Sequence, residues 1–174
     1  VGSEMCIRDR VGLAGCAGVD DYLNGVIKQH EHTLAAKEAD RIRHVDTCDA
    51  NTGPIFLTYR RSPAVELALS TWMSEHTPVY DFVQDDVQQT VWVVDSAPLC
   101  EKLQGLFAAI PALYIADGHH RCASAVKVGL KWREEKPDYT GQEEFNFFLA
   151  VAFPDSELEI LPYNRVVRDL NGLS

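Results

Sequence analysis

The sequence predicts an α/β or α+β domain in which a mixed sheet is flanked by helices. Short apolar segments rich in β-branched and aromatic residues alternate with segments whose apolar residues recur at helical spacing. Residues typical of turns and helix caps separate the two kinds of segment. Of the 174 residues, 46% are hydrophobic and 24% are charged, which is ordinary globular composition.

The strand and helix predictions follow from length, periodicity and flanking residues. Strands are predicted where a short apolar run is bounded by turn residues, at residues 53–59, 90–95, 113–116, 145–153 and 158–161. Helices are predicted where apolar residues share one face, at residues 34–45, 64–73, 98–109 and from 121 onward. Thr33, Ser62 and Ser96 stand at the expected helix starts, and Asn24-Gly25 and Asp85-Asp86 at expected turns.

The two ends of the sequence differ from the rest. Residues 1–10, VGSEMCIRDR, have no periodicity and resemble translated sequencing-adapter text, so we exclude them from the fold prediction. At the other end, the sequence stops where a new helix is expected to begin. We therefore expect residues 11–174 to be an internal fragment of a single domain that is incomplete at its C-terminus.

Net charge, the length of apolar runs and cysteine content limit the partners and the cellular compartment that are expected. The formal net charge of −10 opposes binding to nucleic acid and to anionic membranes. No apolar run approaches the roughly 20 residues that span a bilayer. Five cysteines without a Cys-x-x-Cys pair favour reduced thiols and hence a cytoplasmic protein. Small molecules are the expected partners, and the sequence does not indicate an oligomeric state.

The strongest chemical signal is Asp-Gly-His-His-Arg at Asp117–Arg121, between a predicted strand and a predicted helix. The backbone N–H groups of His119, His120 and Arg121 would lie in the first helical turn, which is a ready anion site. Arg121 adds a planar fork that matches phosphate or carboxylate. The alternative is a polar helix start capped by Asp117.

A second cluster covers Ile27–Val45. In an extended segment, His30 and His32 would share one face with Lys28, and Glu31 would lie on the other. The pair His30 and His32 could ligate a metal, but no third ligand is evident, so we predict no metal site. Glu31 would stay ionised among cations and could accept a proton, or it could form a surface salt bridge.

Further polar residues have weaker signals. Lys37 and Arg41 lie one helical turn apart and form either a basic stripe or a solvated face. Asn164 and Arg165 follow a predicted strand, where they could close on an anion or pair within a loop. Asp85-Asp86 is favoured as a turn over a cation site, and Cys122 as a packed residue over a reactive thiol.

Four motifs in this order resemble the bacterial and archaeal family called domain of unknown function 1015. They are IKQHEHTLAAKEADRIRHV, YIADGHHR, FNFFLAVAF and LEILPYNRVV, and the resemblance covers roughly residues 20–174. Relatives commonly have Tyr where Cys122 stands and Thr-His where Tyr163-Asn164 stand, so this chain lacks the second histidine that those relatives have there. The longer chains of the family imply that this one is truncated.

A more distant resemblance is to the ParB and sulfiredoxin superfamily, which includes free-serine kinases. Gly118, His119, His120 and Arg121 match its phosphate-binding turn, which implies a ParB/sulfiredoxin-like core. Sulfiredoxins have a catalytic cysteine where His119 stands, which argues against that chemistry. The serine kinases use a glutamate base, and Glu31 is the candidate here on chemistry alone.

Together these signals predict phosphoryl transfer to or from a small hydroxyl substrate such as serine or phosphoserine. ATP or ADP and Mg²⁺ are the expected co-reactants, in either the kinase or the phosphatase direction. The expected catalytic groups are Glu31 as base, His120 as acid and Asp117 as magnesium ligand or turn cap. Phosphate would be held by Gly118, His119, His120, Arg121 and Arg165, and substrate by His30, His32, Lys37, Arg41 and Asn164. The alternatives are a nucleotide-binding regulatory switch and a non-catalytic binding module.

Overall fold

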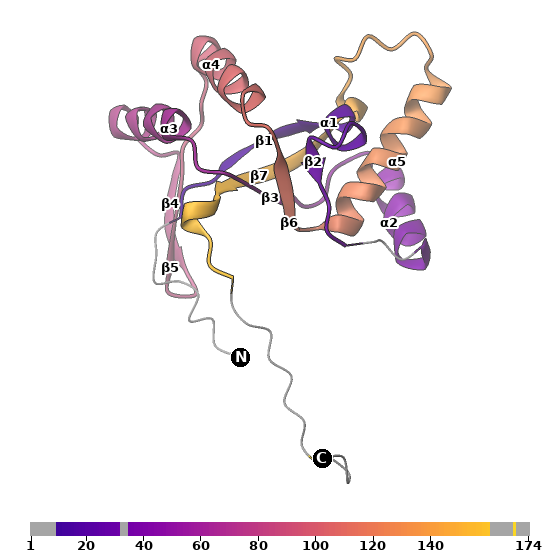
Figure 1. Cartoon of the computed structure of the whole chain (residues 1–174), viewed down its shortest axis with the longest axis horizontal. Coiled ribbons are helices and arrows are strands. Elements are labelled where there is room, and N and C mark those ends of the chain that lie inside the picture. Colours follow the sequence, from indigo (N-terminus) through magenta and orange to yellow (C-terminus); the bar gives the residue numbers. More distant parts are fainter. Residues whose placement is uncertain (1–9, 32–34, 161–168, 170–174) are drawn as a thin grey trace.

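The computed structural model describes residues 10–31, 35–160 and 169, with only the backbone described at residues 35–38. These residues form a five-stranded mixed sheet, flanking helices and a separate hairpin (Figure 1). The sheet order is β1-β7-β3-β6-β2, and its strands are β1 (Leu13–Gly18), β2 (Ile27–Lys28), β3 (Ile55–Tyr59), β6 (Leu113–Asp117) and β7 (Phe147–Pro154). β1 is antiparallel to β7 and β3 to β6, whereas β3 is parallel to β7 and β2 to β6. The predicted mixed α/β architecture is confirmed.

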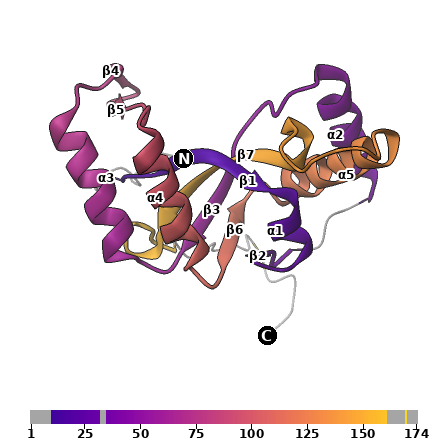
Figure 2. The ribbon, with the colours of Figure 1, turned by 90° about the horizontal axis from the view of Figure 1, so that it is seen from above.

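Helices cover both sides of this sheet. Figure 2 shows α3 and α4 together on one side and α2 and α5 together on the other. The helices are α1 (Val19–Leu23), α2 (Ala35–Cys48), α3 (Pro63–Glu75), α4 (Ala97–Ala108) and α5 (His119–Glu135). The four predicted helices are confirmed. Ser62 and Ser96 stand at N-cap positions, although neither side chain makes a capping hydrogen bond.

The core lies where the sheet meets α5. Every second residue of β3 is buried, from Ile55 to Tyr59, and β7 shows the same alternation. Cys122, Ala125 and Val126 of α5 are buried against this face, as the helical spacing predicted. Burial raises the pKa of Cys122 to about 12, so its thiol stays protonated and packs as a small apolar group.

A close approach fixes α5 against the segment before β7. A Cβ atom on Gly129 would overlap the backbone oxygen of Phe145 and would lie 3.3 Å from Val19. Nearby, Arg133 donates to both carboxylate oxygens of Asp20, at 2.7 and 3.0 Å, and to Asn146 at 2.6 Å. These contacts join α1, α5 and the 3-10 turn at Glu144–Asn146.

Two predicted strands need correction, and two observed strands were not predicted. The predicted strand at residues 90–95 is wrong: β5 (Val87–Val91) ends earlier and pairs with β4 (Tyr80–Gln84) in the hairpin. Residues 158–160 are not a strand, and residue 161 lies outside the described part. β1 and β4 were not predicted at all. Asp85 and Asp86 form the expected turn, with φ of 50° and 61°, the left-handed values of a two-residue hairpin turn.

Within residues 10–31, 35–160 and 169, no helix combines the length and the apolar character that crossing a bilayer requires.

Candidate functional site

The site begins where β6 ends and α5 starts. Gly118 connects them with φ of 93° and ψ of 27°, a left-handed conformation that glycine adopts without steric cost. The first helical hydrogen bond runs from the Cys122 N–H to the Gly118 oxygen, at 2.9 Å. The N–H groups of His119, His120 and Arg121 therefore precede the helical ladder, as predicted, and the positive end of the helix dipole lies here.

Arg121 folds back over this turn. Its Nη2 donates to Asp117 at 2.8 Å, and a Cβ on Gly118 would lie 2.9 Å from the same nitrogen. A Cβ on Gly53, which precedes β3, would lie 3.3 Å from Nη1. The guanidinium thus lies close to two glycines that leave it room. Gly53 was not recognised as part of the site, because it was predicted only as the first residue of the strand at 53–59.

The structure brings Glu31 and His30 to His119. The Glu31 carboxylate lies 3.7 Å from His119 Nδ1, and the His30 and His119 rings meet edge to face with centroids 4.4 Å apart. The expectation that Glu31 and His30 face opposite ways is wrong, because β2 ends at Lys28 and residues 29–31 do not continue the strand. Two segments that are far apart in the sequence therefore share one site.

His119 is held in an environment that disfavours its charged form. Its side chain is 6% exposed, whereas that of Glu31 is 67% exposed. Burial, followed by the positive charge of protonated His30, lowers the pKa of His119, and the Glu31 and Asp117 carboxylates offset this only in part. His119 Nε2 and His120 Nδ1 are buried polar atoms without a hydrogen-bond partner.

This pKa shift gives a pH dependence of stability. Because the folded-state pKa of His119 is lowered, the unfolded chain binds a proton that the folded chain does not, once pH falls below the ordinary value of 6.5. The free energy of unfolding should therefore decrease as pH falls from about 7.5 towards about 5.5. In urea unfolding at the two pH values, the decrease in the free energy of unfolding should be smaller for His119→Gln than for the parent protein. For His44→Gln, at an exposed position on α2, the decrease should equal that of the parent protein. Equal slopes for all three proteins would contradict the assignment.

The remaining predicted site residues are less closely placed. Arg41 is exposed on α2, which packs against α5. Lys37 belongs to α2, but its side chain is outside the described atoms. His32, Asn164 and Arg165 lie outside the described residues. Among the residues that are described, no group of three or more His, Cys, Asp or Glu side chains could hold a metal ion.

Comparison with known proteins gives a family. The family model described as "Protein of unknown function (DUF1015)" matches residues 3–174. The chain belongs to this family. The DUF1015 resemblance of the four sequence motifs is thereby confirmed, and the match also includes residues 3–10, which we set aside as adapter text. Searches of curated proteins and of solved structures gave no match.

Proposed function

We propose that this DUF1015 protein transfers a phosphoryl group to or from a small hydroxyl substrate such as serine or phosphoserine, in the cytoplasm. The phosphate would be held at the Asp117–Arg121 turn, as in the ParB/sulfiredoxin-like core that the motif resembles. The observation that carries the proposal is the meeting of Glu31 with His119 at the N-terminus of α5, 3.7 Å apart. This contact brings a carboxylate to the first residue of α5, and the first turn of a helix suits a bound phosphate, so the arrangement supports proton abstraction next to that phosphate.

In the kinase direction, Glu31, His119, His120 and Arg121 would all take part in the transfer. The substrate oxygen attacks the terminal phosphorus of ATP, the bond from that phosphorus to the ADP oxygen breaks, and Glu31 takes the hydroxyl proton. Neutral His119, with its proton on Nδ1, would orient the Glu31 carboxylate. Arg121 would exchange its Asp117 contact for the transferred phosphate and balance its charge. His120 would serve as acid or as a phosphate contact.

Binding of Mg²⁺ with nucleotide would require few protein ligands at this site. Magnesium at phosphoryl-transfer sites is held by one or two carboxylates together with phosphate oxygens and water. Asp117 is 75% exposed at the end of β6 and could supply such a carboxylate once Arg121 turns to the phosphate. The same exchange favours the second candidate, a nucleotide-binding switch, in which release of Asp117 would be the signal.

A thermal-shift screen distinguishes these functions. The protein would be heated with ATP or ADP and Mg²⁺, with and without serine or phosphoserine. A larger increase in melting temperature with nucleotide and substrate together supports the enzyme, and an increase with nucleotide alone supports the switch. Stabilisation by neither would contradict both and leave the binding module.

Arg121 provides a direct test of the phosphate site. Arg121→Lys keeps the positive charge but removes the planar fork, so nucleotide affinity measured by calorimetry should fall about tenfold. Arg43→Lys is a suitable control, because Arg43 is also paired with an aspartate one turn away but is 79% exposed on α2. If Arg121→Ala bound nucleotide as tightly as the parent protein, the anion site would have to be abandoned.

A further inference from the structure

A groove lies at the opposite end of β6 from the Asp117–Arg121 turn. An open groove of about 780 Å³ runs between α3 and the ends of β3 and β7. Tyr59, at the end of β3, pairs with Leu113 at the start of β6, whereas Asp117 marks the opposite end of that strand. The groove is therefore separated from the Asp117–Arg121 turn by the length of β6, and it has no role in the function proposed above.

Much of the groove is apolar. Its volume falls in the range of small-molecule sites, which are mainly apolar with a few placed polar groups. Tyr59 is only 2% exposed, and Leu67, on α3, is 67% exposed. Val11, Pro63, Leu69, Met73 and Pro154 add further apolar surface.

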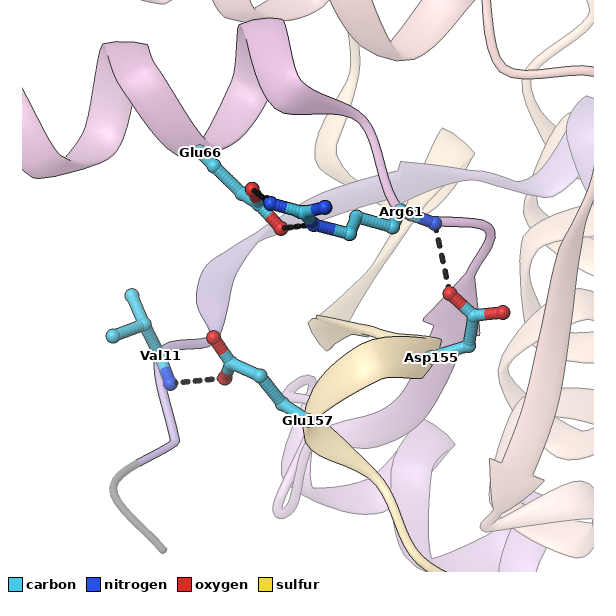
Figure 3. Close-up of polar contacts among 5 residues, drawn as sticks. All are labelled: Val11, Arg61, Glu66, Asp155 and Glu157. Atoms are coloured by element: carbon cyan, nitrogen blue, oxygen red, sulfur yellow. Dashed lines mark hydrogen bonds and ion pairs between the residues drawn. The ribbon is translucent and has the colours of Figure 1, made fainter.

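Among the described residues, the charged groups of the groove are one ion pair and one carboxylate that has no cationic partner. Arg61 donates through Nε and Nη2 to both oxygens of Glu66, at 2.8 to 3.0 Å, so these two charges neutralise each other (Figure 3). Glu157 accepts from the backbone N–H of Val11, at 2.5 Å. Since a backbone N–H carries no formal charge, the lining retains the negative charge of Glu157.

Neighbouring groups hold this arrangement in place. Asp155 accepts from the Arg61 backbone N–H at 2.9 Å and from the Arg60 guanidinium at 2.7 Å, so that its charge is balanced beside the groove. Burial, and then Glu157 and Glu66, raise the pKa of Tyr59 to about 12. The phenol of Tyr59, which lines the groove, therefore stays neutral.

We propose that this groove binds a small primary amine with an apolar chain, whose ammonium group pairs with Glu157 and whose chain lies against Tyr59 and α3. A carboxylate ligand would meet the uncompensated negative charge of Glu157. An uncharged apolar ligand would leave that carboxylate partly desolvated without a counter-charge. An alkylammonium ion satisfies both the apolar surface and the charge.

The test uses simple amines of increasing chain length. An alcohol and a carboxylate with as many carbon atoms as n-hexylamine serve as comparison ligands. Binding of n-butylamine, n-hexylamine and n-octylamine is measured at neutral pH by NMR titration, with 1-hexanol and hexanoate as comparisons. Affinity for the amines should rise about three- to fourfold per methylene group. n-Hexylamine should bind about tenfold more tightly than 1-hexanol, because a charged hydrogen bond is added, and hexanoate should bind most weakly.

A pair of variants locates the charge. Glu157→Gln should weaken n-hexylamine binding about tenfold and leave 1-hexanol binding unchanged, since the amide oxygen can still accept from Val11. Glu159→Gln, an exposed position two residues further on, should change neither. Equal binding of amine and alcohol by the unaltered protein, or no binding of either, would overturn the proposal. If the protein bound a lysine-containing peptide but none of the free amines, the proposal would also be overturned, because the groove would then recognise protein.

Discussion

Replacing Glu31 by glutamine is expected to lower turnover by about 10²-fold or more and to leave nucleotide affinity nearly unchanged. A general base acts only when the substrate loses its proton, so its removal slows the chemical step and not the binding of ATP. Glutamine keeps the size of the side chain and its hydrogen bonding, and it removes the charge that lies 3.7 Å from His119. The measurement is kcat and KM in the reaction that the ligand screen supports.

A purely structural role for Glu31 predicts a different result for the same variant. If Glu31 is only a salt-bridge partner, Glu31→Gln should change stability by about 1 kcal/mol or less and leave kcat unchanged. Glu134→Gln, at an exposed position on α5, controls for the loss of one negative charge near the same helix. A parent-like kcat for Glu31→Gln would remove Glu31 from the mechanism, whereas phosphate binding at the Asp117–Arg121 turn would remain open to its own test.

The largest effect on stability is expected for Gly129→Ala, which should lower the free energy of unfolding by about 2–3 kcal/mol. The new Cβ would overlap the Phe145 backbone oxygen, well inside van der Waals contact. Alanine favours a helix over glycine by about 1 kcal/mol, but that gain is smaller than the cost of moving α5 away from the chain before β7. Urea unfolding gives the difference directly.

Gly105→Ala is the matched control, because Gly105 also lies within a helix, α4, but a methyl group placed there would have nothing within 4 Å. Helix propensity alone should then raise its free energy of unfolding by about 0.5–1 kcal/mol. Opposite signs for the two variants would support the close approach of α5. A stabilised Gly129→Ala would contradict it.

The sequence was most informative where local chemistry determines local structure. Helix α3 was predicted from Ser62-Pro63 and its apolar spacing, and the start of α5 from the turn at Asp117-Gly118. β1 was missed because its Leu-Ala-Gly-Cys-Ala-Gly sequence has low strand propensity and becomes a strand by pairing with β7. β4 was missed because all five of its residues are exposed, so no buried face produces an alternating pattern.

In the candidate site too, local features were predicted and contacts between segments distant in sequence were not. The turn that we propose as the anion site was predicted as a turn before a helix, because Gly118 and the first residues of α5 are adjacent in sequence. The sequence analysis assigned Glu31 to the same catalytic site as His120, but the contact of His119 with His30 and Glu31 was not predicted, since it depends on β2 pairing with β6. The groove beside Glu157 gave no sequence signal, because its lining comes from the segment before β1, from the β3–α3 region and from the end of β7.

The strand order of the main sheet has a consequence for how the chain folds. Each of its pairings, β1 with β7, β7 with β3, β3 with β6 and β6 with β2, joins strands that are not consecutive in sequence. Such pairings have high contact order, since a long loop must close before any ladder hydrogen bond forms, and proteins of this kind fold slowly. The β4–β5 hairpin needs no such closure and can form within microseconds. We therefore expect hydrogen-exchange labelling during refolding to protect the helices and the hairpin before β7, whose protection should report the completion of the sheet.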